Sequence, residues 1–446
     1  MKKFVLLLLT ILLLMPVLDM AHAGGPPPKN VLKGVFTSVD REQHTVILQV
    51  DGSGKLKKLI VGEELALEEV PLGKKVLVSL DPHAGPDVIK DVSVMFMDMT
   101  VIKIFAFLMV GLIGGLLSGF IGSGGAFVLT PAMMSLGAPG AVAVASNMCH
   151  KFPKAMVGAF KRWKYGQADI KLGLVMAVTA IIGVQIGIKV QKFILNHWGN
   201  AGSNLYVSVV FVCVLLLVGA YVLFDAYKLA KGTGEEKQSS LALSLQKINL
   251  WPMMEFKVAK VRISAWITIP VGLMTGMLAA TIAVGGFIGV PGMIYVVGAS
   301  ALVASATELI VAFIMGAWGS IQWGLSGLID IRMTLLILAG SLIGVQLGAL
   351  GTTYVKDYMI KLVMAAVMLI VAVSRGAKIP GYLADLNIGP VLGERLAFVL
   401  NTISFWALIA ALAVAGVIIT VAMIRGMIQA KVEERQQSVE GALPHS

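Results

Sequence analysis

The sequence predicts an all-α polytopic membrane protein with two inverted repeats of five segments, preceded by a small N-terminal β domain. Composition gives the first indication: the 446 residues are 57% hydrophobic and only 14% charged, with a mean hydropathy of +0.86. These values exclude an ordinary soluble enzyme, a disordered chain and a coiled coil. Eleven apolar runs follow residue 100, in groups of five, five and one, and the two groups of five align at a constant offset of 161 residues.

The formal net charge of +11 does not indicate nucleic-acid binding, because the Lys and Arg residues lie mainly in short loops between apolar runs. In such loops they orient helices in a lipid bilayer. The two cysteines, Cys149 and Cys213, lie in separate apolar segments and predict neither a disulfide nor a thiolate metal site. No HExxH motif and no GxxxxGK[ST] loop occurs, so we expect no catalytic centre, metal or cofactor.

Residues 1–23 are predicted to form a signal peptide. Two lysines precede an apolar run, and Ala21-His22-Ala23 has the small-x-small pattern that a signal peptidase accepts. We expect cleavage after Ala23, and an uncleaved anchor is the alternative. Both place the following residues outside the cytoplasm.

Residues 24–100 are predicted to form a small periplasmic β domain. Runs rich in β-branched residues at 45–50, 58–61 and 75–80 each end at turn-forming residues. The spacing predicts a five-stranded barrel or sandwich without catalytic or metal-binding motifs. We expect an accessory or docking domain whose periplasmic partner the sequence does not identify.

Two of the eleven apolar runs are too short to cross a bilayer. The second run of each group, 124–137 and 285–298, has 14 residues, which span about 21 Å of a core about 30 Å thick. We therefore expect a broken or half helix at both places. The other runs are 101–122, 141–160, 170–191, 204–228, 263–283, 300–320, 332–354, 357–374 and 402–424.

The basic residues predict the orientation of these runs. Four lie in 161–171 and seven in 228–262, and loops with such an excess face the cytoplasm. From an external N-terminal domain, all five runs of the first group must then cross the membrane, so the second group is inverted. Its loop at 322–332 is predicted to be external and holds a single basic residue, Arg332.

The boundaries that follow divide the rest of the chain into six parts. They are transmembrane repeat 1 at 101–228, a cytoplasmic linker at 229–262, transmembrane repeat 2 at 263–375, a periplasmic loop at 376–401, an extra C-terminal transmembrane helix at 402–424 and a cytoplasmic tail at 425–446.

The offset of 161 residues superposes the halves without a gap from Gly111 to Gly187. The Asp-Ile pair at 169 falls on the pair at 330, and the Gly-Val-Gln triplet at 183 falls on the triplet at 344. Inverted halves that each contain a broken segment are typical of a secondary transporter with its site near the midplane.

Glycines flank both short runs. Unwound backbone is tolerated in a bilayer only where it is buried or lines a cavity, and free N–H groups at a half-helix N-terminus attract anions. We expect Ser123, Gly124, Gly125, Gly285 and Gly286 to contact a small anionic substrate. At the other repeated glycines we expect close helix packing instead. These are Gly111, Gly115, Gly158, Gly183 and Gly187.

The third run of each half carries the polar residues expected at bilayer depth. Asn147, Lys151 and Lys154 share one helical face, and Glu308 is the equivalent of Asn147 at the offset of 161. Charged residues at this depth are functional candidates. A lysine with hydroxyls and open N–H groups suits an oxyanion better than a metal cation. Ser146, Asn147, Lys151 and Thr307 are therefore predicted substrate contacts.

Each of the charged candidates has an alternative role. Lys151 binds substrate or acts as a counter-ion, and Glu308 is either an ion-coupling residue that carries a proton or a structural partner of Lys151. Lys154 contacts substrate or extends to the membrane interface, and His150 is expected to be a packing residue. Asp169 and Asp330, at segment starts, are expected to cap helices.

The first half contains several motifs of glycine, proline and small residues. They are Gly119-Phe120-Ile121-Gly122-Ser123-Gly124-Gly125, Pro131, Leu136-Gly137-Ala138-Pro139 and Ala143-Val144-Ala145-Ser146-Asn147. With these motifs the chain resembles the TauE/SafE family of sulfite and organosulfonate permeases. The resemblance covers about 101–375. It implies an inner-membrane carrier that exports sulfite, sulfoacetate or related sulfur anions, or takes up organosulfonates.

Together these features predict a multi-pass protein of the bacterial inner membrane that exports small sulfur oxyanions by alternating access. One alternative is a proton-coupled uptake permease for another organic or inorganic anion. A second is a membrane assembly or sensor protein that acts through its periplasmic domain. The sequence leaves open whether the protein forms a homo-oligomer.

Overall fold

A computed structural model describes the chain from residue 31 to residue 440, apart from gaps at 42, 52–53, 62–74, 81–84, 86, 122–124, 232–239, 352–356 and 389–391. Its contacts divide the chain into two units, Met1–Ile104 and Phe105–Ser446. The predicted signal peptide lies outside the described residues.

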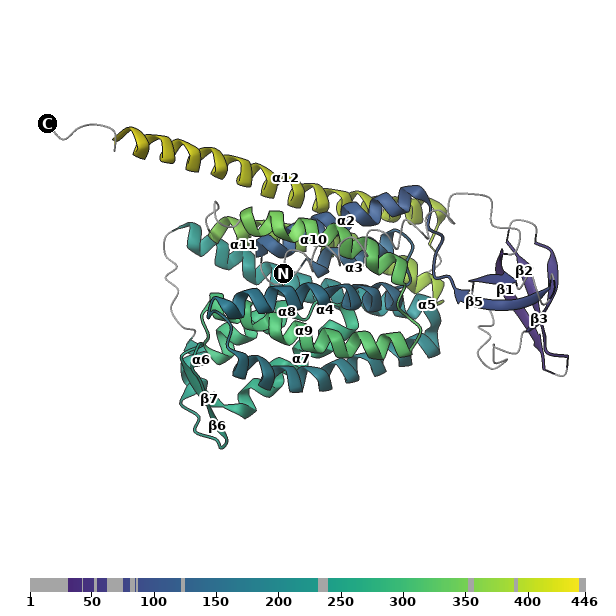
Figure 1. Ribbon diagram of the computed structural model, residues 1–446, viewed down its shortest axis with the longest axis horizontal. Helices are drawn as coiled ribbons and strands as arrows, with labels where there is room; N and C mark the ends of the chain where they lie inside the picture. The colour runs from purple at the N-terminus through teal and green to yellow at the C-terminus, as the bar shows by residue number, and fades with distance from the viewer. Residues whose placement is uncertain are drawn as a thin grey trace. The chain divides into compact units, whose positions relative to one another are not determined.

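Five strands of the first unit close into a barrel (Figure 1). They are β1 (Val31–Asp40), β2 (Thr45–Val50), β3 (Leu56–Val61), β4 (Lys75–Leu80) and β5 (Val88–Val94). The order is β1-β2-β3-β5-β4, with β3 and β5 parallel and β1 pairing with β4. This is the topology of an OB-fold barrel. The structure thus confirms the barrel and not the sandwich.

The barrel closes around an apolar interior because alternate side chains of a strand point to opposite faces of the sheet. Val46 and Leu48 of β2 are fully buried, whereas Ile47 between them is partly exposed. Phe36 of β1 and Leu59 of β3 complete the centre of the interior.

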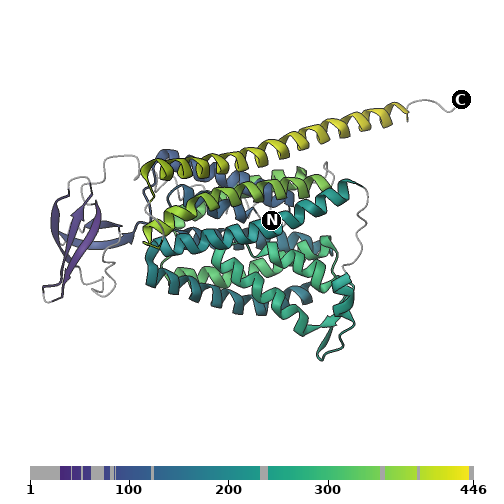
Figure 2. The ribbon, with the colours of Figure 1, turned by 180° about the vertical axis from the view of Figure 1, so that it is seen from behind.

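The second unit is helical (Figures 1 and 2). Its helices are α2 (Val101–Ile121, which begins in the first unit), α3 (Ala126–Ser135), α4 (Gly140–Lys164), α5 (Ile170–Ala230), α6 (Ser240–Gln246), α7 (Ala265–Ile282), α8 (Gly286–Gly292), the π-helical turn η2 (Met293–Val297), α9 (Ala301–Leu325), α10 (Ile331–Gly351), α11 (Asp357–Asp385) and α12 (Glu394–Glu440). Seven helices in the described part of the chain are long and apolar enough to cross a membrane. The chain is therefore a multi-pass membrane protein.

The two predicted half helices are confirmed. α3 has 10 residues, and α8 continues directly into η2 to give a second short apolar helix, Gly286–Val297. Within α5, Gly199 has non-helical backbone angles (φ 60°, ψ −156°) and separates the two predicted segments, 170–191 and 204–228.

Some predicted boundaries differ from the helices of the structure. α11 continues to Asp385 and α12 begins at Glu394, so the predicted loop 376–401 is helical over most of its length. Hydropathy falls there, but hydropathy marks apolar runs and not helix ends. The predicted linker 229–262 also contains α6 and a hairpin of β6 (Met253–Phe256) and β7 (Val261–Ser264).

Glycines bring the helices of the two halves into backbone contact. A Cβ on Gly115 of α2 would collide with the carbonyl of Ser341 in α10, and a Cβ on Gly276 of α7 would collide with the carbonyl of Ala180 in α5. The repeat offset of 161 residues relates the two pairs with the halves exchanged, because Gly276 is the equivalent of Gly115 and Ala180 is the equivalent of Ser341. The same offset relates four further contacts, which form two exchanged pairs. They are Gly111 with Ile337 and Gly272 with Met176, and Gly344 with Leu112 and Gly183 with Leu273.

The first helix of each half therefore packs on the fourth segment of the other half. Only the missing glycine side chains allow backbones to approach so closely. The packing role expected of Gly111, Gly115 and Gly183 is confirmed.

Hydrogen bonds link the halves in the same exchanged way. The Asp169 N–H donates to Thr307 Oγ1 at 3.0 Å, and the equivalent Asp330 N–H donates to Ser146 Oγ at 3.0 Å. Asp169 Oδ1 accepts the N–H of Leu172 at 3.0 Å, and Asp330 Oδ1 accepts that of Met333 at 3.2 Å. The helix-capping role expected of both aspartates is confirmed.

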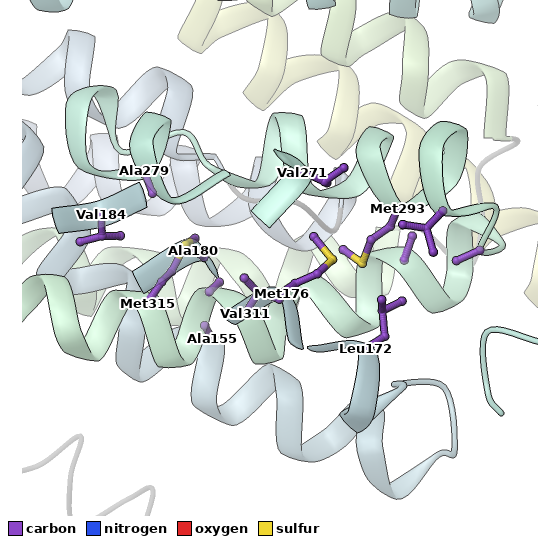
Figure 3. Packing of buried hydrophobic residues seen from close by; sticks show 14 of the residues in the cluster. Ala155, Leu172, Met176, Ala180, Val184, Val271, Ala279, Met293, Val311 and Met315 are labelled. Atoms are coloured by element: carbon purple, nitrogen blue, oxygen red, sulfur yellow. The ribbon is translucent and has the colours of Figure 1, made fainter. Parts of the chain in front are cut away.

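The interface between α4, α5, α7 and α9 is a continuous apolar core (Figure 3). Met176, Ala180 and Val184 lie on one face of α5, at a spacing of four residues, and are fully buried. Their labelled neighbours in Figure 3 are Ala155, Leu172, Val271, Ala279, Met293, Val311 and Met315.

The contact between Gly276 and Ala180 predicts that replacing Gly276 with alanine lowers stability, the opposite of the usual effect of this substitution in a helix. In a helix, Gly→Ala ordinarily stabilises by about 0.5–1 kcal/mol. Gly416→Ala, where nothing lies within 4 Å, should follow this trend. Gly276→Ala should instead destabilise the protein by about 1–3 kcal/mol through overpacking. Thermal unfolding in detergent tests this, and equal shifts for the two variants would contradict the packing role of Gly276.

Replacing the two capping aspartates with alanine should lower the stability of the protein by different amounts. Asp169 Oδ2 also accepts the N–H groups of Val258 (2.9 Å) and Ala259 (3.1 Å) in the β6–β7 turn, whereas Asp330 Oδ2 lies 3.5 Å from Arg332. Asp330→Ala should cost about 1 kcal/mol, as other cap losses do. Asp169→Ala should cost at least about twice as much, because it leaves further N–H groups unpaired. Asp169→Ala should also make the β6–β7 hairpin more sensitive to proteolysis. Equal losses of stability in the two variants, with a hairpin that stays resistant to proteolysis, would contradict the additional role of Asp169.

Candidate functional site

Both half helices begin beside the middle of a full-length helix. Gly125, the N-cap of α3, lies against the carbonyl of Gly114 in α2, and Gly285, the N-cap of α8, lies against the carbonyl of Thr275 in α7. Neither N-cap provides a side-chain hydrogen bond. Of the predicted contacts, Ser123 and Gly124 lie outside the described residues.

The first turns of the two half helices meet each other. The rings of Phe127 in α3 and Phe287 in α8 pack edge to face, with centroids 4.8 Å apart. Thr130 Oγ1 donates to the carbonyl of Ile282 at the end of α7, at 3.4 Å. The positive ends of two helix dipoles, one from each half, thus converge within the helical unit.

Asn147 fixes the first of these turns. Its Nδ2 donates to the carbonyl of Ala126 at 3.1 Å and to Thr130 Oγ1 at 2.7 Å, and the residue is fully buried. Its Oδ1 has no partner among the described residues. Asn147 therefore holds α3 with its amide nitrogen and leaves one acceptor unused.

Glu308, the equivalent of Asn147, faces the other half helix. Its carboxylate occupies the space that a side chain on Gly289 of α8 would need. The residue is 2% exposed, and neither carboxylate oxygen has a hydrogen-bond partner in the described part of the chain. Gly289 is thus required to admit a buried acid beside the half helix.

Lys151 completes the group of buried charges. Its side chain is buried, and Nζ finds no hydrogen-bond partner among the residues described. Lys151 and Glu308 lie close enough for their charges to interact. Lys154, about one turn further along α4, is half-buried. His150 Nδ1 bonds to the carbonyl of Asn147 at 2.8 Å, which agrees with a packing role.

Ser146 and Thr307, two predicted substrate contacts, form hydrogen bonds between the two halves. Their hydroxyls accept the N–H groups of Asp330 and Asp169, as described above. These contacts link Gly125, Asn147 and Lys151 of one half to Gly285, Gly286 and Glu308 of the other, through the neighbouring residues of the two half helices. The cluster of these six residues is called the central site below.

Several residues of this region carry no signal in the sequence. Thr130 is an ordinary hydroxyl in an apolar run until Asn147 is seen to bond to it. Phe127 and Phe287 are hydrophobic residues among many others, and no helical spacing predicts that they meet across the halves. Gly289 was detectable in principle, because it lies one turn after Gly285 on the same short helix.

A bundle of membrane-spanning helices in which two half helices meet beside buried charges has the architecture of a membrane transporter. Comparison with known protein families identifies the family of the chain. The family model "Sulfite exporter TauE/SafE" matches residues 107–375, more than half of the chain, and the chain belongs to this family.

Three relatives from Bacillus subtilis (strain 168) are similar over the same region. Probable membrane transporter protein YdhB is 24% identical over 253 residues, covering 55% of this chain and 89% of that protein. Probable membrane transporter protein YjnA is 22% identical over 265 residues, with 59% and 96% covered. YunE, which has the same description, is 22% identical over 271 residues, with 58% and 93% covered. No solved structure matches the chain.

The proximity of Lys151 and Glu308 predicts energetic coupling between them. Lys151→Met and Glu308→Gln each remove one charge, and their effects on the free energy of unfolding should be non-additive by about 0.5–3 kcal/mol. Chemical unfolding of the single and double variants in detergent measures this. The control pairs Glu308→Gln with Lys161→Met at the exposed end of α4, where additivity is expected. Additive effects for both pairs would contradict the coupling.

Proposed function

We propose that this protein is a secondary transporter of the bacterial inner membrane that exports a small sulfur oxyanion, such as sulfite, sulfoacetate or a related sulfonate. The observation that carries the proposal is the meeting of two half-helix N-termini, through Phe127 and Phe287, beside a buried lysine whose Nζ has no hydrogen-bond partner among the described residues. The proposed substrate class follows the name of the matching family.

The chemistry of the central site supports an anion. An ammonium group and the N–H groups of two helix N-termini are hydrogen-bond donors to negative oxygens. A bound metal ion needs clustered ligands, and no group of three or more His, Cys, Asp or Glu residues in the described chain could hold one. Lys151 would supply the charge, and Gly125, Gly285 and Gly286, with Ser123 and Gly124, would supply the N–H groups.

The remaining predicted contacts take more specific roles in this proposal. Asn147 orients the first turn of α3, and its Oδ1, which has no partner in the part of the chain that is described, suits a protonated oxygen of the substrate. Ser146 and Thr307 anchor the opposite half to the helix that carries the site. Glu308 would take up a proton when the substrate leaves and so couple the two movements.

Alternating access between two inverted repeats is the proposed mechanism. It is supported by the exchanged contacts, in which Gly115 with Ser341 and Gly276 with Ala180 are related by the repeat offset. Equivalent contacts on both sides of a central site allow one half to tilt against the other in two equivalent ways. The charge difference between the loops 161–171 and 322–332 supports the inversion.

The membrane potential favours the outward direction. An anion that leaves a negatively charged interior gains about 2.3 kcal/mol per charge per 100 mV. Export therefore needs no coupled ion, whereas uptake requires one. In this orientation the barrel is periplasmic, where we propose that it docks a partner protein.

Anion flux into proteoliposomes tests the proposal. Wild-type protein should carry sulfite or sulfoacetate under an imposed potential. Lys151→Ala should lower the flux about tenfold or more, because a lost charge-assisted hydrogen bond costs about 1.5–3 kcal/mol. Glu308→Gln should keep potential-driven flux and lose the response to a pH gradient.

The matched control is Lys161→Ala, which removes an exposed lysine from the same helix. It should transport like the wild type. Absence of flux for both anions under every gradient would rule out the proposed substrate class. Equal flux in Lys151→Ala and Lys161→Ala would rule out the role given to Lys151.

A further inference from the structure

Arg375 is a second buried cation, remote in sequence from the charges of the central site. It lies in α11 within a candidate membrane span, Lys361–Asp385, and is fully buried. One nitrogen, Nη2, donates to Ser135 Oγ at 2.5 Å and lies 3.5 Å from Ser404 Oγ. Nε and Nη1 have no partner in the described chain. Two sides of the guanidinium fork are thus unsatisfied.

In the described part of the chain its surroundings hold further positive charge and no carboxylate that pairs with it. Lys378, one turn along α11, is close enough for like-charge interaction with Arg375, and its Nζ donates to Asn401 Oδ1 at 2.6 Å. Within the described residues neither Arg375 nor Lys378 forms an ion pair. Asp385 at the end of α11 is exposed. Two neighbouring cations in a membrane span call for a negative partner.

A purely structural role does not account for the free nitrogens. Arginine at a helix C-terminus often binds the last carbonyls of that helix. The last carbonyls of α3, those of Ala132, Met133 and Met134, accept backbone N–H groups, and Nε and Nη1 of Arg375 bond to none of them. The contact with Ser135 is made by one nitrogen only. The fork remains available to a group that accepts two hydrogen bonds.

We propose that Arg375 and Lys378 form a second binding site for an oxyanion group, at the junction of α3, α11 and α12. A sulfate-like or phosphate-like group accepts two parallel N–H bonds from a guanidinium in a planar fork. The hydroxyls of Ser135 and Ser404 are the remaining donors. α12, which supplies Ser404 and Asn401, lies beyond residues 107–375, so part of the site comes from outside the region that matches the family.

α3 connects the two sites. Its N-cap, Gly125, belongs to the central site, and its last residue, Ser135, contacts Arg375. Ten residues of helix separate them by about 15 Å. An oxyanion group bound at Arg375 would thus lie at one end of the half helix whose other end belongs to the central site.

Direct binding of two probes to the purified full-length protein in detergent tests the proposal. Radiolabelled sulfate, titrated against chloride at constant ionic strength, represents a free anion. Phosphatidylglycerol retained in native mass spectrometry, against phosphatidylcholine, represents a lipid headgroup. One of the two probes should bind wild-type protein saturably, and that probe identifies the source of the oxyanion group.

Variants show whether this binding occurs at Arg375. Arg375→Gln should weaken it about tenfold or more, since a charged hydrogen bond is lost. Ser404→Ala, which removes only a hydroxyl, keeps the test valid if Arg375→Gln does not fold, and it should weaken binding measurably. Arg395→Gln on α12, an exposed arginine, is the matched control. The proposal is overturned if Arg375→Gln and Arg395→Gln bind both probes equally, or if wild-type protein binds neither.

Discussion

The structure of the helical unit depends on direct backbone contact between its two halves. A half helix ends inside the bundle, and its unpaired backbone groups are tolerated there only if protein surrounds them. The glycines of α2 and α7 allow α10 and α5 to approach without intervening side chains, as between Gly276 and Ala180. Gly125 and Gly285 then fit against α2 and α7 in turn. Without these approaches, neither half helix could begin at its present depth.

Periodicity and internal repetition predicted most of this arrangement. The lengths of the runs identified α3 and α8 as half helices, and the offset of 161 residues identified the glycines that pack. The partners of hydroxyl groups could not be predicted, because Ser146 and Thr307 bond to whichever N–H the opposite half presents. Arg375 is not distinguished by the sequence pattern, because hydropathy falls at its position although the helix continues to Asp385.

The linker between the halves breaks the symmetry of the framework. Asp169 and Asp330 cap equivalent helices, yet only Asp169 also binds the turn of the β6–β7 hairpin. Residues outside the repeats thus contact one of two equivalent positions, Asp169 and not Asp330. α12 does the same at the other end of the sequence, where Ser404 meets Arg375. Both additions modify a repeated core at a single place.

The exchanged contacts have the form of an isologous interface. Two separate copies of one half, related by a two-fold axis, would make both glycine contacts with a single set of residues. In such a dimer the positions of Asn147 and Glu308 would carry the same side chain, and a glutamate there would bring two like charges into the interior. Joining the halves in one chain removes this restriction. A single carboxylate can face a single lysine, and the unequal pair is compatible with an otherwise duplicated framework.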